Sequence, residues 1–495
     1  MKKLLAGWSE VSITPENKRI SLAGQFFERI SEYVETPITV TALAIESDGE
    51  QMIICSCDVA SVSQALVDEV REKLSGVAGL DVNKIIINAT HSHTSHVYSR
   101  GTTSAIGTTK DVIDRYLPEE KQYRALVSAT DKDIMRPNEA ADFLVERISL
   151  AIKNAWEGRK EGSYATGFGR AAIGMCRRVC YDDGSAKMWG DTNRASFTHL
   201  EGGNDSGIEL LFFFDDSKKL TGVVANVACP SQVVEHRSFI SSDYWGKVRI
   251  LLREKFGEDL KVLGLCSPAG DQCPRDMIRW VNPETPIDDP NIERPDYIER
   301  DADPSMFDIK GTWKVGKRIV NEILSAYDEI ENTYDEALLV HKTLKVDLPI
   351  RRVTPAEYEV SVKALEDFAV KLTGHANFAD NAAMYIHAGT ILRYEQQHTE
   401  DIKTIEVHIA RLGDIAFATN PFELFLDYGN QMRARSRARQ TFLIQLACDA
   451  CGYLPTKKAE DGGHYSAYVT SGITGHVGGE ILTRKTISEI NEMFK

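Results

Sequence analysis

Apolar runs typical of buried strands alternate along this chain with amphipathic helical patterns. Strand-like runs lie at residues 42–45, 52–55, 85–89, 208–214, 223–227 and 261–265. Apolar residues three and four apart, which share one face of a helix, mark 66–74, 140–155, 248–256 and 315–327. This alternation predicts an α/β fold with sheets flanked by helices, and not an all-helical or sandwich architecture.

Two long irregular segments interrupt this order. Residues 97–137 are rich in Thr, Ser and charge, and residues 281–311 hold five prolines among many acids. Long irregular segments in a compact enzyme usually form lids or substrate walls, and both follow candidate site motifs. The 495 residues exceed the usual size of one core. We expect one large domain over 1–495, with insert-like loops at 97–137 and 281–311.

The composition of the chain limits the kinds of binding partner and the cellular compartment that we expect. A net charge of −15 argues against nucleic acid or an anionic membrane as partner. No apolar run is long enough to span a bilayer, and the N-terminal apolar stretch is too short for a secretory signal. Nine cysteines without framework spacing, including Cys448 and Cys451, favour a reducing cytoplasm. We therefore expect a cytoplasmic protein that acts on a small molecule without membrane insertion, and a homo-oligomer is compatible with the sequence.

The run Ile85–Ala89 delivers three of the twelve histidines into the loop that follows it. The carboxyl end of a buried strand is where open α/β sheets usually place their chemistry. His91 and His93 lie two apart, so in extended chain they point to the same side and could converge on one metal ion. The alternative is a polar loop whose histidines bond their neighbours.

A second candidate segment follows the strand that ends near Asn226. It runs through Cys229 and Pro230 to Glu235 and His236, and then to a Ser-Ser-Asp turn. Asp243 is well placed as a helix N-cap. His236 is either a site residue or an ordinary surface histidine.

Two further strands end in loops with chemically capable residues. Ser267 and Cys273 are candidate nucleophiles after the strand at 261–265, although a simple turn is the alternative. Glu423 follows the strand at 415–419 in an apolar frame, where an unpaired carboxylate would be costly to bury. A metal cation or one of the arginines at 433–439 would satisfy it.

In order along the chain, these segments resemble the neutral/alkaline non-lysosomal ceramidase superfamily. The resemblance rests on collinear segments from residue 7 to about 470. These are Gly7–Pro15, Ala89–Thr94, Ile240–Asp243, Gly270–Pro274, Pro421–Glu423 and Tyr453–Thr456. The resemblance implies a neutral-ceramidase-like catalytic domain with mixed β-sheets and long active-site loops. The chain ends without the C-terminal Ig-like β domain seen in many ceramidases, so none is expected here.

The resemblance also implies a mononuclear zinc site. Its ligands would be His91, a later histidine, Glu423 and Tyr453, with His93 beside the metal and an arginine of the Cys176–Arg178 segment facing the substrate. The sequence departs from the pattern where the second zinc histidine is expected, because it reads Cys229-Pro230 there. His236 is the preferred substitute and Cys229 the alternative. The family serine is replaced by Cys273.

These residues predict a zinc-dependent hydrolase. A metal-activated water would attack an amide, ester or glycosidic-type bond of a small polar substrate, with acidic compounds among the candidates and His93 as proton shuttle. Arg177, Arg178 or Arg275 could hold an anionic group by bidentate contacts. The catalytic candidates are His93, Cys273, Arg177, Arg178 and Asp271, and the metal candidates are His91, His236, Glu423 and Tyr453. Two alternatives stay open, a metal-dependent lyase or isomerase acting on carbohydrate and a non-catalytic ligand-binding homologue.

Overall fold

The fold is known from a computed structural model, which describes residues 3–25, 28–100, 109–122, 131–279 and 308–495. Its main sheet has eight strands in the order β14-β13-β12-β7-β1-β4-β5-β6. The pairs β13/β14 and β5/β6 are parallel, and the others are antiparallel. In chain order the bounds are β1 Leu5–Ser12, β4 Thr39–Ser47, β5 Glu50–Cys57, β6 Ile85–Ala89, β7 Lys160–Arg170, β12 Gly207–Asp215, β13 Leu220–Val227 and β14 Lys261–Cys266.

A second sheet of four strands packs face to face against the first. Its order is β16-β17-β18-β20, with β18 and β20 parallel. One apolar cluster joins the sheets, with Ile54 and Ile86 from the first and Phe417 and Phe442 from the second. The bounds are β16 Leu339–Pro349, β17 Ile402–Leu412, β18 Ile415–Thr419 and β20 Gln440–Ile444.

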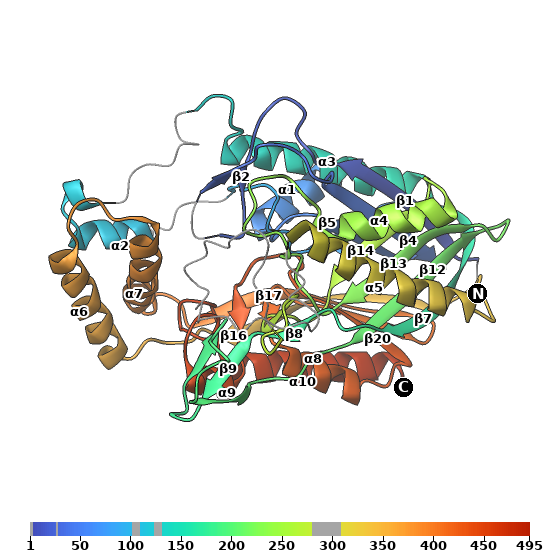
Figure 1. Ribbon diagram of the computed structural model, residues 1–495. Coiled ribbons are helices and arrows are strands. Elements are labelled where there is room, and N and C mark those ends of the chain that lie inside the picture. The colour runs from blue at the N-terminus through green and yellow to red at the C-terminus, as the bar shows by residue number, and fades with distance from the viewer. Residues whose placement is uncertain (1–2, 26–27, 101–108, 123–130, 280–307) are drawn as a thin grey trace.

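Helices cover the outer face of each sheet, as Figure 1 shows. Separate apolar clusters join the main sheet to α1 and α3 and to α4 and α5, and the second sheet to α8 and α10. Strand β6 begins with three successive isoleucines because both of its faces are buried: Ile85 and Ile87 face the helices, while Ile86 faces the second sheet. The bounds are α1 Gln64–Leu74, α3 Pro137–Glu157, α4 Asp243–Phe256, α5 Asp308–Asp328, α8 Leu426–Arg435 and α10 His476–Met493.

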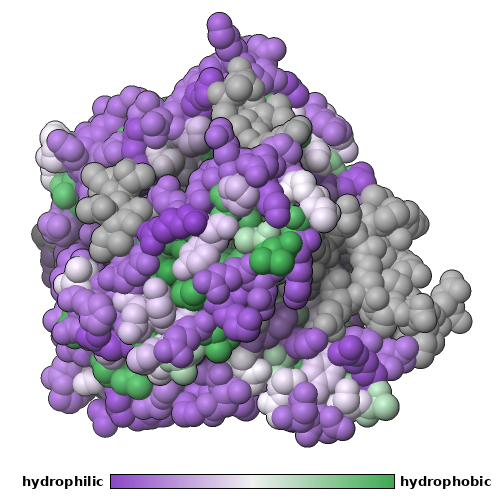
Figure 2. Space-filling view, turned by 90° about the vertical axis from the view of Figure 1, so that its left-hand side faces the viewer, coloured by the Kyte–Doolittle hydropathy of each residue, from purple (hydrophilic) through white to green (hydrophobic). Residues whose placement is uncertain are grey.

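Three further helices form a satellite at one end of the molecule (Figure 1). They are α2 Thr109–Tyr116, α6 Pro355–Lys371 and α7 Phe378–Gln396, and they share a small apolar cluster of their own. Seen from this end, the described surface is mostly hydrophilic with small scattered hydrophobic patches (Figure 2). Within the described residues, no helix is both long and apolar enough to cross a membrane.

Short elements complete the chain and build the loops around the site. They are β2 Ser21–Leu22, β3 Arg29–Ile30, β8 Met175–Cys176, β9 Arg178–Tyr181, β10 Ala186–Met188, β11 Phe197–Leu200, β15 Gln272–Cys273, β19 Glu423–Leu424, β21 Tyr453–Leu454, α9 Lys457–Gly462 and two 3-10 turns at Val82–Lys84 and Glu119–Lys121.

The α/β class is confirmed, and most expected elements lie where the sequence places them. Two expectations need correction. The segment 97–137 is not irregular throughout, because it contains α2, whose Val112 and Ile113 pack into the satellite. Asp243 is not an N-cap: Ser242 holds that position and Asp243 is the first residue of α4. Of the segment 281–311, residues 281–307 lie outside the described residues, and 308–311 begin α5.

Candidate active site

Three parallel strand pairs bring their carboxyl ends to one region of the molecule. β6 ends before His91, β13 before the loop that holds Glu235, and β18 before Glu423. Backbone hydrogen bonds tie these loops together, from His93 N to Ser231 O at 3.2 Å and from Gly270 N to Leu424 O at 2.9 Å. The loops after parallel strands meet at the same edge, so residues far apart in sequence form one site.

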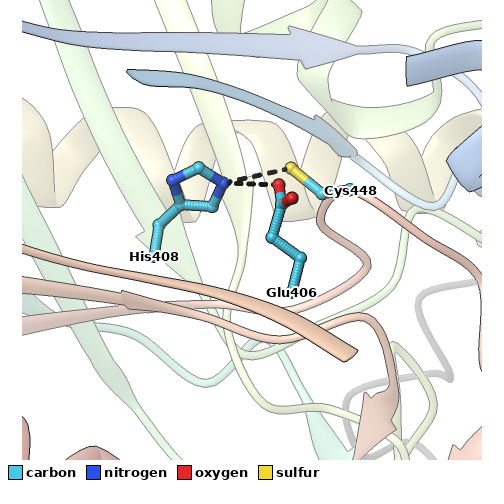
Figure 3. Close-up of side chains that lie close together, drawn as sticks. All are labelled: Glu406, His408 and Cys448. Atoms are coloured by element: carbon cyan, nitrogen blue, oxygen red, sulfur yellow. Dashed lines mark hydrogen bonds and ion pairs between the residues drawn. The ribbon is translucent and has the colours of Figure 1, made fainter. Parts of the chain in front are cut away.

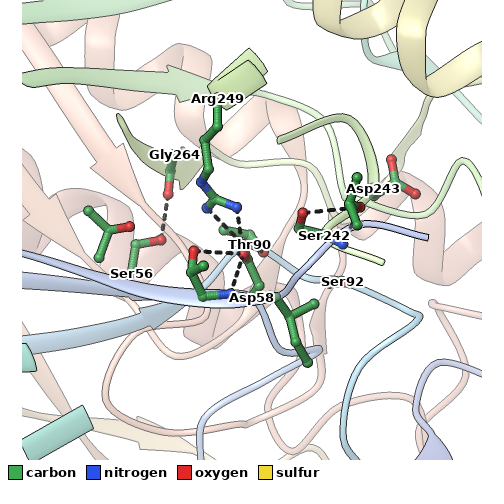
Figure 4. A network of polar contacts seen from close by, with 12 residues as sticks. Ser56, Asp58, Thr90, Ser92, Ser242, Asp243, Arg249 and Gly264 are labelled. Atoms are coloured by element: carbon green, nitrogen blue, oxygen red, sulfur yellow. Dashed lines mark hydrogen bonds and ion pairs between the residues drawn. The ribbon is translucent and has the colours of Figure 1, made fainter. Parts of the chain in front are cut away.

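His91 is held in a fixed orientation at the end of β6. Its backbone has a φ of 64°, a conformation that few residues other than glycine adopt. Its Nδ1 lies 2.5 Å from the carbonyl oxygen of Ala60, in the loop after the neighbouring strand β5. The preceding Thr90 bonds the buried Asp58, and the following Ser92 bonds the carbonyl of Ser241 (Figure 4). Because a carbonyl only accepts, Nδ1 carries the proton and Nε2 is free to act as a ligand or base.

His93 has a matching arrangement with a carboxylate. Its Nδ1 lies 2.9 Å from Oε2 of Glu235, and its Nε2 lies 3.2 Å from Nε2 of His91. Gly24 packs against this ring so closely that a Cβ there would lie 2.3 Å from Cγ of His93. Burial and the neighbouring His91 hold the pKa of His93 well below its usual value. His93 is therefore neutral, with a lone pair on Nε2.

Glu423 is the second side chain in contact with Nε2 of His91. Its Oε2 lies 3.3 Å from Nε2 of His91, and the short parallel pair β19/β21 places it directly opposite Tyr453. The Tyr453 hydroxyl hydrogen-bonds the Glu423 carboxylate. Burial opposes the charge on each group, but their attraction raises the pKa of His91 and lowers that of Glu423.

Nε2 of His91 thus lies between two neighbours, Nε2 of His93 at 3.2 Å and the Glu423 carboxylate at 3.3 Å. Because Nδ1 of His91 faces a carbonyl, a proton or a cation at Nε2 is needed for His91 and Glu423 to attract each other. Histidines with one nitrogen fixed by a carbonyl or carboxylate and the other directed inward are the usual arrangement around a protein-bound metal. An imidazole, a carboxylate and a phenol, from His91, Glu423 and Tyr453, form a donor set that fits a divalent cation such as zinc.

His236 does not join this cluster. Burial lowers its pKa to about 4, and its charge partners include Asp308 and Glu235. No group of His, Cys, Asp or Glu that includes His236 or Cys229 brings three ligand atoms within 4.8 Å of one another in the described part of the chain. It is the neighbouring Glu235, not selected from the sequence, that reaches the site. An acid directly after the apolar pair Val233 and Val234 was the signal that could have identified it.

Arg177 and Arg178 point into different surroundings, although they are adjacent. Arg177 lies in the site, with its guanidinium 3.3 Å from the Tyr453 hydroxyl and 3.1 Å from the carbonyl oxygen of Gly270. Arg178 is fully buried in an ion pair with Glu201, at 2.7 and 3.1 Å. It also donates to the carbonyls of Ala459 and Gly463. Arg178 therefore stabilises the fold and does not face a substrate.

The loop 267–273 has a structural role. Asp271 accepts a hydrogen bond at 2.9 Å from the amide of Leu426, the first residue of α8. Burial raises the pKa of the Cys273 thiol to about 11, and its Sγ faces the carbonyl of Arg275. The Ser267 hydroxyl is bonded by Arg433. None of these surroundings activates a nucleophile, because no base among the described residues contacts the thiol or the hydroxyl.

A second cluster has metal-like composition but holds an arginine. Glu406, His408 and Cys448 are the one group of three such side chains, among the described residues, whose ligand atoms all lie within 4.8 Å of one another (Figure 3). The guanidinium of Arg71 lies 2.6 Å from Glu406, 3.5 Å from His408 and 3.8 Å from the thiol. Its permanent charge supplies the cation that this carboxylate needs, so the cluster is a buried ion-pair network.

Comparison with known proteins identifies the fold. No protein-family profile and no curated protein sequence matches the chain. Solved structures do, among them the neutral ceramidase from Pseudomonas aeruginosa, with a TM-score of 0.65 at 16% identity, and a ceramidase complexed with C2, with 0.66 at 13% identity. The alignments cover 98% and 99% of this chain and 73% and 75% of those chains. The chain therefore has the neutral-ceramidase-like fold, in a strongly diverged sequence.

Proposed function

We propose that this protein is a zinc-dependent hydrolase whose centre is formed by His91, Glu423 and Tyr453. The observation that carries the proposal is the contact of His91 Nε2 with the Glu423 carboxylate and with His93 Nε2, while both Nδ1 atoms face acceptors. The similarity of the fold to two ceramidases, which are hydrolases, supports the same class of reaction. The bond cleaved would be an amide, ester or glycosidic-type bond of a small polar substrate.

Each side chain has a definite task in this proposal. When bound, a zinc ion would supply the Lewis acidity that activates water near neutral pH. His91, Glu423 and Tyr453 would hold the ion. The neutral Nε2 of His93 takes up the proton of the attacking water and returns it to the leaving group. Glu235, hydrogen-bonded to Nδ1 of His93, stabilises the imidazolium that forms in between.

The remaining expectations stay proposals. Arg177 is in place to orient the substrate, since its guanidinium adjoins the Tyr453 hydroxyl. We keep one catalytic domain over 1–495, because both sheets contribute loops to the site. A reducing, cytoplasmic location is supported by the nine cysteines, all of which are free.

Elemental analysis of the purified protein tests the centre directly. We expect about one zinc per chain in the wild type, and loss of the metal in His91→Ala and Glu423→Ala. Cys448→Ser is the matched control, because it removes a ligand atom from the cluster that Arg71 already occupies, and it should keep its zinc. Circular dichroism confirms that each variant is folded.

Two results would overturn the proposal. One is zinc that survives both site variants but is lost in Cys448→Ser, which would move the metal to the Glu406 cluster. The other is a wild type that stays metal-free after incubation with zinc.

A further inference from the structure

A short buried turn contacts the two loops that carry His93 and Glu235. It consists of Ser241, Ser242 and Asp243 at the start of α4, and all three residues are 0% exposed (Figure 4). Its contacts reach the chain next to both members of the His93–Glu235 hydrogen bond. The turn is therefore in a position to decide whether these two side chains meet.

On one side the turn fixes the chain around His93. The carbonyl oxygen of Ser241 accepts hydrogen bonds from the Ser92 hydroxyl at 2.9 Å and from the Thr94 hydroxyl at 2.8 Å. The Ser241 amide donates to the carbonyl of Thr94 at 3.1 Å. Since Ser92 and Thr94 are the two neighbours of His93 in the sequence, the turn holds the backbone on both sides of the ring.

On the other side the carboxylate of Asp243 fixes the chain next to Glu235. Its Oδ2 accepts a hydrogen bond from the amide of Val234 at 3.1 Å, and its Oδ1 accepts one from the amide of Tyr244 at 2.7 Å. Val234 directly precedes Glu235, whose carboxylate lies 2.9 Å from Nδ1 of His93. Asp243 thus connects the start of α4 to the residue that bonds the His93 ring.

The side chain at position 243 meets a demand that the start of a helix does not make. The backbone of Asp243 has a φ of 55°, which favours glycine, asparagine or aspartate. Of these three, only ionised aspartate offers two acceptor oxygens for two amides, whereas a helix start needs one. Among the described residues the buried carboxylate forms no ion pair, so its burial costs stability. Such a cost is expected where a residue serves the reaction.

We propose that Asp243 is a positioning residue that holds Glu235 against His93. It acts through the amide of Val234, while the Ser241 carbonyl keeps the chain around the ring in place. With Glu235 as acceptor, Nδ1 of His93 carries the proton and Nε2 presents its lone pair. Loss of Asp243 lets the imidazole exchange between its two tautomers. The effect on catalysis rests on the proposed hydrolase function, whereas the effect on the ring does not.

The position of the proton on His93 tests this inference without a substrate. NMR of protein labelled with ¹⁵N in its histidines shows which ring nitrogen carries the proton, and His93→Gln identifies the His93 signals by their absence. At pH 8 Asp243 is charged, because burial raises its pKa only to about 7. We expect the proton on Nδ1 in the wild type and a mixture of tautomers in Asp243→Gly, which suits a φ of 55° but has no carboxylate. Asp243→Asn, which keeps one acceptor oxygen, should fall between them and also serves if the glycine variant does not fold.

Turnover of 4-nitrophenyl acetate at pH 8 measures the consequence for catalysis. Asp243→Gly should lower kcat about 10- to 100-fold with little change in KM, the range found when a group that orients an active-site side chain is removed. Glu235→Gln should lower kcat similarly. The double variant should be at most about twofold slower than Glu235→Gln alone, because both residues act through the same hydrogen bond.

Ser47→Ala is the matched control for a general loss of stability. It removes a buried hydrogen bond of 2.6 Å to the carbonyl of Ala337. Ser47 lies in β4 opposite the start of β5, whereas the site lies past the end of β5. This variant should unfold at a lower urea concentration than the wild type but keep its kcat and the His93 tautomer.

Two results would overturn the inference. One is a His93 ring that keeps its proton on Nδ1 in Asp243→Gly. The other is a double variant whose loss of kcat is the product of the two single losses, because independent effects multiply. A wild type that turns over no ester would count against the hydrolase proposal alone, since the tautomer still decides the role of Asp243.

Discussion

The ion pair between Asp58 and Arg249 supports the loop that presents His91. Asp58, directly after β5, is fully buried, and Arg249 of α4 is 6% exposed at its side chain. Two hydrogen bonds of 2.7 and 3.1 Å join them, as Figure 4 shows. The carboxylate also accepts from the Thr39 amide and the Thr90 hydroxyl. Removal of one partner leaves the other charge buried without a counter-charge. A single substitution should therefore destabilise the fold strongly, and a second substitution that removes the remaining charge should add less than its own single effect.

The expected magnitude follows from this burial. Asp58→Ala should lower the free energy of unfolding by about 3–5 kcal/mol, because Arg249 cannot release its charge. Arg249→Met, which keeps the length of the side chain but not its charge, should cost a similar amount. The double variant should cost less than the sum, with an interaction energy of about 1–3 kcal/mol.

Equilibrium unfolding in urea, followed by circular dichroism, measures all four proteins of this cycle. Asp335→Ala is the matched control, because its partner Lys3 is half exposed and the loss of this surface pair should change the free energy of unfolding far less. A cost below about 1 kcal/mol for Asp58→Ala, or additive effects in the double variant, would refute the reasoning.

Three further predictions each follow from the local surroundings of one residue. Iodoacetamide at pH 8 should label Cys180, the one cysteine that is not fully buried, before it labels Cys273, because burial raises the pKa of the Cys273 thiol to about 11. Mass spectrometry that finds Cys273 labelled first would contradict this prediction. Burial raises the pKa of Asp243 from 3.8 to about 7, so the folded chain keeps a proton between about pH 4 and 7 that the unfolded chain has released. The free energy of unfolding should therefore fall as the pH rises through that window, and Asp243→Asn should remove this component from urea midpoints measured at pH 5 and pH 8. Gly24→Ala should lower hydrolytic activity more than stability, because the added methyl group displaces the His93 ring. Urea unfolding measures the change in stability and turnover of 4-nitrophenyl acetate measures the change in activity. Unchanged turnover would contradict the prediction.

The sequence by itself determined the α/β class and the loop that holds His91 and His93. Strand β6 is recognisable because both of its faces are buried, which requires apolar residues at successive positions. The pairing of His91 with His93 follows from local chain geometry, and Glu423 was identifiable as an acid in an apolar frame. Properties that depend on a few residues adjacent in sequence can thus be predicted without knowledge of the fold.

Only the tertiary structure decided which distant residues complete the site. Glu235 and not His236 bonds His93, and Arg177 and not Arg178 adjoins Tyr453, although each pair is adjacent in sequence. Neighbouring side chains can point in opposite directions, so one residue decides between the site and the core. Similarly, Glu406, His408 and Cys448 have the composition of a metal site, but Arg71 reaches them from helix α1 and makes them an ion-pair network. The physical reason is that charge compensation depends on distances in space, which the order of residues does not specify.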